Sequence, residues 1–437
     1  MEINQFHSGT AVGDAITNQM LELQSLLKDR GYKSEIYAEY IAEGLEDRIK
    51  PISQYEGAAE NILFVHHSMQ TNSFEKIISL PDKKALIYHN ITPAHFFEDE
   101  GLKKAVCTGL KQTEEYRKYV DYAIADSNFN RKELLGMGYT DVDVMPVQIS
   151  LNRFDKTESD QKVKADSSKY KNFIFVGRVV PNKKPDDVIR VFSVYHKYYN
   201  KNSRLFLIGD DSMNDYVQSL KKLCLDIQVS DCVFFTGRVS EKELKAYYEI
   251  ADLFLCMSEH EGFGVPLLEA MKMNVPIVSY SSSAIPETMG GAGVLVTEKN
   301  YAYTGALCNE ILEDKDLYEK IVQKENIRID KLEKTNTDKI LFSIIERIQS
   351  GERKRTIQLQ GPFETSYSLA IVNRKLIETI DDISQDYDAS IYCTEGPGDY
   401  EPKEEDLKGK EHARLLWEKS KTVSYPDVVI RNMYPPR

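Results

Sequence analysis

The feature that most constrains the fold is the alternation of short apolar runs with longer amphipathic stretches, which extends over most of the 437 residues. Short apolar runs bounded by turn residues are typical of strands in a parallel sheet, and the amphipathic stretches between them are typical of covering helices. The alternation stops once, at residues 155–171, where DKTESDQKVKADSSKYK is charged and has no apolar period. The sequence therefore predicts an α/β chain with two Rossmann-like parallel-sheet domains, residues 1–154 and 172–350, joined by a polar linker.

Each half contains enough apolar runs for an open sheet, and ligands bind such sheets at the carboxyl ends of the strands. We therefore expect the two domains to face each other across a cleft. Residues 315–350 are strongly charged with a helical period, and we expect them to close the second domain. The predicted strands are 2–6, 34–38, 61–65, 85–88, 122–125 and 142–145, then 172–176, 204–208, 232–236, 252–257, 276–280 and 293–296. The predicted helices are 14–30, 102–119, 128–138, 185–199, 214–224, 241–250 and 265–273.

Composition and charge exclude several classes of protein. The net charge of −13 argues against a nucleic-acid-binding protein, which needs positive charge to neutralise phosphates. The N-terminus lacks the layout of a signal peptide, and no window approaches the ~18 apolar residues of a membrane-spanning helix. The six cysteines form no CxxC pair, so we interpret them as reduced residues of the interior. We expect a cytoplasmic protein, and peripheral contact with the inner membrane face or a membrane-anchored partner stays open.

The segment EHEGFGVPLLEAMKM, residues 259–273, is the clearest candidate site. It follows a predicted strand and begins a predicted helix, whose free amides favour an anion. Gly262 and Gly264 allow the backbone to approach a ligand closely. Glu261 in the loop and Glu269 in the helix are ionised acceptors that suit pairs of sugar hydroxyls. The alternative interpretation is an ordinary helix start with two solvated carboxylates.

A second candidate lies in FIFVGRVVPNKKPDDVI, residues 173–189. Arg178 and Lys183 follow a predicted strand and precede a predicted helix. Two cations at the carboxyl end of a strand can hold a diphosphate, Arg through a bidentate fork and Lys as a point charge. The alternative is a basic surface turn, and the position of this segment upstream of the acidic, glycine-containing loop favours the binding interpretation.

These segments, with LFLIGD, VFFTGRVS, YEIADLFLCM and VPIVSYSSSAIPE, occur in the order and spacing of the retaining glycosyltransferases of family 4. The chain resembles that family over about residues 1–345, and Glu261 and Glu269 match its E-x7-E motif. The resemblance implies the GT-B fold, which consists of two facing Rossmann-like domains. It also implies transfer of a hexose from a nucleotide-diphosphate sugar with retention of configuration, and without a metal ion or other cofactor.

The resemblance implies roles for the donor-side residues. Arg178 and Lys183 would hold the donor diphosphate and, together with the helix start, stabilise the charge on the leaving group. Glu261 would face the transferred sugar, and Glu269 the ribose hydroxyls. Three backbone amides would also face the sugar: those of Phe263, Gly264 and Val265.

The first domain supplies the remaining candidates. His89, in LIYHNITPAHFF, corresponds to the family's histidine near the sugar. Gly9 and Gly13, in HSGTAVGDA, match the glycine-bearing loop that closes over the phosphates. The sequence departs from the family where Asp14, and not a second glycine, follows Gly13.

Other polar residues receive weaker interpretations. His66 and His67 are secondary candidates at the end of a predicted strand, and His260 is assigned no role. Asp210 and Asp211 form a DD pair after a predicted strand, which we interpret as a turn and not as a metal-binding DxD motif.

Residues 351–437 form an α/β extension. TIQLQGPFETSYSLAIVNRKLIETI reads as strand, loop and helix, DASIYCTEG as a second strand and PDVVIRNMYPP as a third. The extension resembles the start of another glycosyltransferase of the same class, cut before its donor-binding half. The alternative is an appended extension that packs on the main body.

The combined expectation is a hexosyltransferase of bacterial surface polysaccharide synthesis, resembling the first module of tandem enzymes that make mannan-type O-antigens. GDP-mannose is the favoured donor, and the acceptor is a growing glycan or lipid-linked glycan. Two alternatives stay open. One is a non-catalytic subunit that binds a nucleotide sugar, and the other is a nucleotide-sugar 2-epimerase of the same fold.

Overall fold

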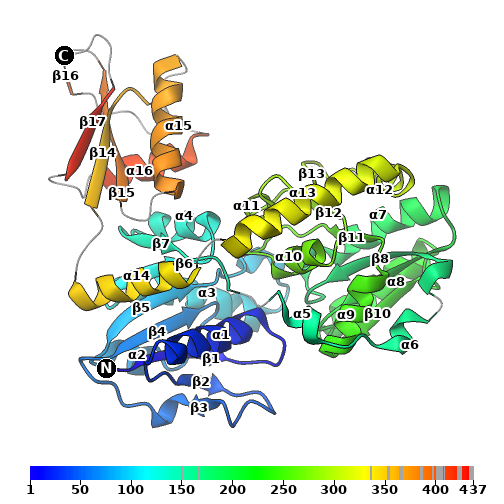
Figure 1. The fold of residues 1–437 in the computed structure, drawn as a ribbon, viewed down its shortest axis with the longest axis horizontal. Coiled ribbons are helices and arrows are strands. Elements are labelled where there is room, and N and C mark those ends of the chain that lie inside the picture. Colours follow the sequence, from blue (N-terminus) through cyan, green and yellow to red (C-terminus); the bar gives the residue numbers. More distant parts are fainter. Residues whose placement is uncertain are drawn as a thin grey trace.

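The computed structural model contains three sheets, of seven, six and four strands. Figure 1 shows the two larger sheets in neighbouring bodies and the smallest one beside the first of them. The structure describes residues 1–148, 151–165, 167–334, 337–351, 355–363, 368–383, 387–395, 398–399, 407, 409–420 and 426–432.

The first domain is built on the seven-stranded sheet, whose order is β3-β2-β1-β4-β5-β6-β7 and whose strand pairs are all parallel. Both faces are buried, so successive residues of one strand face different helices. In β4, Leu63 and Val65 pack under α2, α3 and α4, whereas Ile62 and Phe64 pack against α1. The strands are β1 (Ile3–Gly9), β2 (Ile36–Tyr40), β3 (Ile49–Pro51), β4 (Ile62–His67), β5 (Lys83–Tyr88), β6 (Tyr122–Ala125) and β7 (Val142–Val144). The helices are α1 (Ala15–Asp29), α2 (Phe74–Ser79), α3 (Glu100–Tyr116) and α4 (Asn128–Gly136).

The second domain repeats this plan with six parallel strands in the order β10-β9-β8-β11-β12-β13. Helices α7, α8 and α12 cover one face, and α9, α10 and α11 cover the other. The strands are β8 (Lys171–Val176), β9 (Ser203–Ile208), β10 (Val233–Gly237), β11 (Leu253–Cys256), β12 (Ile277–Tyr280) and β13 (Val294–Val296). The helices are α7 (Pro185–Tyr198), α8 (Asn214–Asp226), α9 (Glu241–Ile250), α10 (Val265–Lys272), α11 (Ile285–Met289), α12 (Tyr301–Glu313) and α13 (Lys315–Lys334).

The predicted fold class, two Rossmann-like parallel sheets, is confirmed. Each predicted strand of residues 1–296 corresponds to an observed one with small shifts at its ends. The short strand β3 and the helices α2, α11 and α12 were not predicted. Among the described residues, every helix is too short or too polar to cross a lipid bilayer.

The end of the second domain corrects one expectation. Residues 315–350 form two helices, and the second of them, α14 (Thr337–Ser350), packs on the first domain. Figure 1 shows α14 lying over the first sheet, away from the second domain. The expectation that the whole segment closes the second domain is therefore wrong for α14. The physical reason is that its apolar side covers sheet surface that α1 leaves open. That side consists of Ile340, Leu341, Ile344, Ile345 and Ile348.

The polar segment between the domains contains short helices and is bonded to the second domain. Its elements are α5 (Arg153–Lys156), α6 (Gln161–Lys164) and the 3-10 turn Ser167–Lys169. The ammonium of Lys245, in α9, donates to the carbonyls of Phe154 (2.7 Å) and Thr157 (2.8 Å). Hydrogen bonds to α9 therefore fix the crossover between the two sheets.

The extension contains β14 (Arg355–Gly361), α15 (Ser368–Ile383), β15 (Tyr387–Glu395), β16 (Gly398–Asp399), α16 (Glu411–Ser420) and β17 (Val428–Arg431). Its strand order is β16-β15-β14-β17, which repeats the order β3-β2-β1-β4 of the first domain. As in the first domain, the central strand pairs in parallel with both neighbours. The extension thus has the topology with which a Rossmann-like sheet begins.

Candidate active site

The predicted site residues lie at the carboxyl ends of strands from both sheets. In each sheet the order in which successive strands are added changes direction at a switch point, which lies between β1 and β4 in the first sheet and between β8 and β11 in the second. Ligands of doubly wound sheets bind at such points. His89 follows β5, Arg178 follows β8 and Glu261 follows β11, so the topology brings these three positions to facing sheet edges.

The loop after β11 leads into an open helix start. Gly264 precedes α10 with φ at +93° and no side chain caps the helix. In the first turn Pro266 has no N–H and the Leu267 amide donates to the Gly264 carbonyl at 3.1 Å, so the Val265 amide is the one left for an anion. A left-handed conformation of this kind favours glycine. The hydroxyl of Ser283 accepts from the amide of Glu261 at 2.8 Å, which fixes the loop just before the helix. The predicted amides of Phe263, Gly264 and Val265 therefore lie at this helix start.

Lys183 and Glu261 form an ion pair beside the start of α10. Lys183 lies in the 3-10 turn Pro181–Lys183 that follows β8, so the pair connects the two predicted motifs. Arg178 is on the same connection; its side chain is exposed and forms no hydrogen bond or ion pair within the described part of the chain. One cation is therefore paired with the loop carboxylate, and a second is available nearby.

A further ion-pair cluster supports this loop. The ammonium of Lys299 contacts the carboxylate of Asp187 at 2.6 Å and also pairs with Glu259. The Tyr301 hydroxyl donates to the other oxygen of Asp187 at 2.6 Å. Since Asp187 is in the first turn of α7, the cluster ties the loop after β11 to the helix after β8. Sequence reasoning missed this cluster because its members are far apart along the chain.

Glu269 lies in α10, the predicted helix, and its carboxylate is buried. Its side chain is only 5% exposed, and its two oxygens are bonded to Arg153 and, at 2.8 Å, to the Tyr248 hydroxyl. Burial raises the pKa of Glu269 above its ordinary value, and the positive charge of Arg153 opposes that rise. Both oxygens have protein partners in this structure, and the contact of Glu269 with the ribose hydroxyls stays a prediction.

His89 belongs to a buried chain of hydrogen bonds. Its Nδ1 lies 2.7 Å from Asp126, and its Nε2 lies 2.8 Å from His66. The other nitrogen of His66 lies 3.0 Å from the amide oxygen of Gln5, whose nitrogen donates to the carbonyl of Met20. Because the nitrogen of Gln5 donates to Met20, its oxygen is the group that accepts from His66. Both nitrogens of His89 are thus engaged within the first domain, one with Asp126 and the other with His66.

Three other histidines, His66, His67 and His260, are buried at the end of β4 and in the loop after β11. Burial, with the nearby charge of His89, lowers the pKa of His66 well below its ordinary value. His67 is bonded to the carbonyl of Gly109 at 3.0 Å, and burial lowers its pKa to about 4. Burial and the charge of Lys183 lower the pKa of His260 to about 4. These three imidazoles are neutral at pH 7.

The glycine-bearing loop lies at the end of β1. Gly9 is the last residue of β1, and Gly13 has a φ of +79° with open space where a side chain would stand. Asp14, the departure from the family pattern, caps α1 by accepting from the amide of Thr17 at 3.0 Å. A carboxylate therefore occupies the start of α1, where a phosphate would otherwise find a free amide.

The two domains touch at Gly262. The hydroxyl of Ser127, at the start of α4, donates to the carbonyl of Gly262 at 2.9 Å. A Cβ at Gly262 would lie 2.7 Å from the backbone oxygen of His89. Nearby, Glu287 of α11 accepts from the amides of Asn128 (2.8 Å) and Phe129 (3.3 Å). The start of α4 thus lies against the loop after β11, residues 257–264, which we call the donor loop after its proposed role. Asp126, Ser127 and Glu287 are residues of this candidate site that the sequence reasoning missed.

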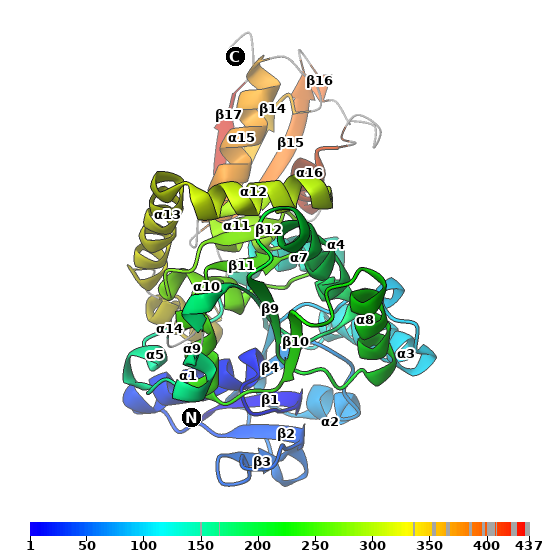
Figure 2. The ribbon, with the colours of Figure 1, turned by 90° about the vertical axis from the view of Figure 1, so that its right-hand side faces the viewer.

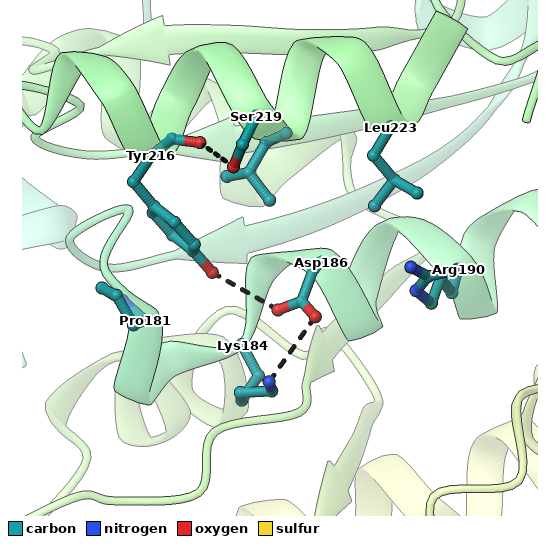
Figure 3. A pocket seen from close by; sticks show the side chains of 8 residues that line it. Pro181, Lys184, Asp186, Arg190, Tyr216, Ser219 and Leu223 are labelled. Atoms are coloured by element: carbon teal, nitrogen blue, oxygen red, sulfur yellow. Dashed lines mark hydrogen bonds and ion pairs between the residues drawn. The ribbon is translucent and has the colours of Figure 1, made fainter. Parts of the chain in front are cut away.

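A shallow pocket of about 260 Å³ lies next to this site, between α7 and α8. Figure 3 shows Lys184 and Asp186 from the start of α7 beneath Tyr216 of α8. Asp186 contacts the Tyr216 hydroxyl at 3.3 Å and the Lys184 ammonium at 3.5 Å. The polar groups at its mouth are therefore paired with each other, and none of the predicted site residues lines it.

The Asp210–Asp211 pair is a turn at the end of β9. Asp210 pairs with Arg238 at 2.9 Å and accepts from the amide of Ser212 at 3.0 Å. Within the described ranges, the one group of three close carboxylates and histidines is in the extension, where it consists of Asp381, Asp382 and His412. Five of the six cysteines are buried as predicted, and Cys107 is exposed.

The two facing Rossmann-like sheets, with a loop and helix start between them, define a GT-B fold. Solved structures agree with this assignment. Anabaena Alr3699/HepE in complex with UDP and glucose has a TM-score of 0.62 and 17% identity, with 80% of this chain and 100% of that chain covered. The lipopolysaccharide glycosyltransferase WaaG has a TM-score of 0.61 and 12% identity over the same shares. At these identities the likeness shows the fold alone.

The family comparison is more specific. Residues 155–328 match the model of the family "Glycosyl transferases group 1". The chain therefore contains a glycosyltransferase group 1 domain, and the predicted resemblance is confirmed for it.

Two relatives match part of the chain. The O-antigen chain mannosyltransferase RfbU of Salmonella typhimurium is 29% identical over 205 residues, which are 46% of this chain and 53% of the relative. A GDP-mannose-dependent phosphatidylinositol monomannoside mannosyltransferase of Mycobacterium tuberculosis is 29% identical over 152 residues, 33% of this chain and 38% of the relative. The matched region thus spans about half, or less, of the length of these relatives.

Proposed function

We propose that this chain is a glycosyltransferase that moves a hexose, with mannose favoured, from a nucleotide-diphosphate sugar to a glycan acceptor in bacterial surface polysaccharide synthesis. The group 1 domain supports the reaction class. Two relatives named as mannosyltransferases support the choice of mannose, and one of them is named as dependent on GDP-mannose. GDP-mannose is accordingly the first donor to test, and a growing or lipid-linked glycan is the acceptor class.

The observation that carries the proposal is the Lys183–Glu261 pair beside the open start of α10. A donor diphosphate placed there meets the Lys183 ammonium, the exposed Arg178 and the Val265 amide of the helix start. These groups stabilise the negative charge that develops on the leaving diphosphate. Since the protein itself supplies this charge stabilisation, the mechanism that we propose needs no metal ion.

The first domain would supply the opposite wall. The His89 ring, held by Asp126, lies across from the donor loop. Three buried polar atoms near Gly262 have no hydrogen-bond partner within the described part of the chain: Asn90 Oδ1, Asp126 Oδ1 and Asn130 Nδ2. Sugar hydroxyls, which both donate and accept, are the kind of group that satisfies such a set. We propose attack from the face that the leaving group occupies, with retention of configuration.

The test is a donor panel with product analysis. The purified chain is titrated with GDP-mannose, UDP-sugars and dTDP-rhamnose in thermal-shift measurements, and the best donor is then incubated with labelled glycan acceptors. We expect a labelled product whose anomeric configuration by NMR matches that of the donor, and equal rates with and without EDTA. An epimerised nucleotide sugar without transfer would support the 2-epimerase alternative. Tight donor binding without any turnover would support a non-catalytic subunit.

We also propose that the extension is a Rossmann-like unit of the same kind as the start of the first domain. The repeat of the β3-β2-β1-β4 order in β16-β15-β14-β17 supports this proposal. Strand β14 pairs in parallel with β15 and β17, as β1 does with β2 and β4, whereas β16 pairs with β15 antiparallel. An experimental structure in which β14 pairs with neither β15 nor β17 would contradict this assignment.

A further inference from the structure

The extension is attached to the first domain by a buried ion pair. The two terminal nitrogens of the Arg131 guanidinium, Nη1 and Nη2, contact the carboxylate of Asp381, and the Nη2 contact is 2.6 Å long. The side chain of Arg131 is 5% exposed and that of Asp381 is 0% exposed. Arg131 lies in α4 and Asp381 near the end of α15. Figure 1 shows the extension next to α4 and β7, and Figures 1 and 2 both show it on the side of the first domain away from β3.

Other contacts make this a built interface. His412, at the start of α16, contacts the same Asp381 carboxylate at 2.8 Å. Leu415, in α16, packs against the apolar core of the first domain. The guanidinium of Arg131 also donates to the carbonyl of Val142 at 3.0 Å. Because a fully buried carboxylate is costly without partners, Asp381 requires Arg131 and His412 around it.

The start of α4, about one turn before Arg131, contacts the donor loop. Ser127 donates to the Gly262 carbonyl, and Glu287 accepts from the amides of Asn128 and Phe129. The Glu287 carboxylate also interacts favourably with the positive end of the helix dipole. α4 is nine residues long, about two and a half turns. Arg131 follows Ser127 by four residues, about one helical turn. The extension therefore binds α4 one turn after the contact between Ser127 and Gly262, which joins the two domains.

We propose that the docked extension holds α4 in the position in which its first turn meets Gly262 and Glu287. In this assignment Arg131 and Asp381 are positioning residues, which act on the cleft through α4 and touch no substrate. The effect on α4 follows from the interface alone. The effect on transfer rests on the proposed function.

The test compares two conservative variants of the full chain, Asp381→Asn and Asp382→Asn. Asp382 is the next residue of the same helix; its side chain is 39% exposed and lies 3.9 Å from His412, and Arg131 is paired with Asp381 instead. The readouts are hydrogen exchange of the amides of residues 128–131, donor turnover, and fluorescence of Trp417, the one tryptophan of the chain. Trp417 lies in α16, so its emission reports whether the extension is folded.

We expect Asp381→Asn to speed exchange in residues 128–131 by about 10-fold or more and to lower kcat/KM by a similar factor, because loss of one buried partner frees the helix. Asp382→Asn should change neither. If Trp417 emission shows that Asp381→Asn unfolds the extension, Arg131→Lys, which keeps the charge but loses the bidentate contact, should give a smaller change in the same direction. Unchanged exchange and turnover in both Asp381→Asn and Arg131→Lys would overturn the proposal. Faster exchange in a protein that transfers no sugar even as wild type would refute the proposed function and leave the role of the extension intact.

Discussion

Gly262 is the position at which a single methyl group tests the closed arrangement of the domains. In a Gly262→Ala variant, the new Cβ would lie 2.7 Å from the His89 backbone oxygen and 3.0 Å from the Cβ of Asn90. Ordinary contact begins at 3.4 Å, so the shortest approach is too close by about 0.7 Å. The opposing atom is backbone, and no side-chain rotation relieves the contact. The domains or the donor loop must therefore move apart by several tenths of an ångström.

The expected loss follows from that displacement. Overpacking of this kind costs about 1–3 kcal/mol, which the closed state alone would bear because the contact lies between the domains and not within a core. A misplacement of catalytic groups by ~1 Å costs about 100-fold in rate. We therefore expect kcat/KM for the donor to fall by about 10- to 100-fold, whereas the Tm of the two domains changes little.

Steady-state kinetics with the best donor, together with small-angle scattering, would check this expectation. Gly136→Ala is the matched control, because it also lies at α4 and has nothing within 4 Å of the added Cβ. The control should keep wild-type turnover. Wild-type kcat/KM and an unchanged radius of gyration in Gly262→Ala would refute the reasoning, since the methyl group would then fit without opening the cleft.

Three further predictions concern single groups. Lys183→Ala should lower kcat by about 100-fold or more while circular dichroism stays unchanged, because one of the cations that meet the leaving diphosphate is lost; near-normal turnover would exclude Lys183 from the site. Asp126→Asn should lower kcat/KM by about 10- to 100-fold, since a hydrogen bond to a charged group contributes about 1.5–3 kcal/mol, and the matched Asp121→Asn, at an exposed bend, should not; equal kinetics in both would contradict the role of Asp126 in positioning His89. Glu325→Gln should raise the free energy of unfolding at pH 8–9 and change it little at pH 5, as measured by urea unfolding at both pH values. An equal effect at the two pH values would contradict a buried Glu325 carboxyl that is neutral at pH 5.

The sign of the Glu325 prediction follows from its burial. Burial raises the pKa of Glu325 from 4.5 to about 8, so the folded protein binds a proton there that the unfolded chain releases above its own, lower pKa. This contribution to stability is fully present below pH 4.5 and is lost as the pH rises toward 8, by up to about 1.4 kcal/mol per pH unit. One oxygen accepts from the Ile277 amide at 3.0 Å, and the other has no partner among the described residues. Gln keeps the first contact and removes the titration.

Much of the fold was predictable because its signals are local. Apolar runs such as residues 172–176 and 204–208 are strands wherever a sheet forms, and the capping pair Ser240–Glu243 marks the start of α9 as observed. The strand β3 was missed because its sequence, IKP, has a single buried apolar residue and a proline, and so shows no apolar run. The apolar side of α14 predicted a buried helix, but periodicity carries no information about which of two sheets will cover it.

The site was predictable as two segments at the carboxyl ends of strands. The ion pair between Lys183 and Glu261 was not predicted, because the adjacency of β8 and β11 is a property of the assembled sheet. The position of Glu269 in α10 was predictable, whereas its pairing with Arg153 was not, because Arg153 reaches it from the crossover between the domains. The roles of these residues in donor binding stay predictions.

The sequence by itself determined the two parallel sheets, the loop and helix start after β11, and the family resemblance, because propensity, period and motif spacing act within a few residues. Only the tertiary structure decided that α4 lies between the donor loop and the extension, that α14 crosses back to the first domain, and that Asp126 pairs with His89. Each of these is a contact between segments far apart along the chain. Such contacts depend on which apolar surfaces and buried charges face each other once the sheets have assembled. Local sequence patterns do not contain this information, because they describe only residues that are close along the chain.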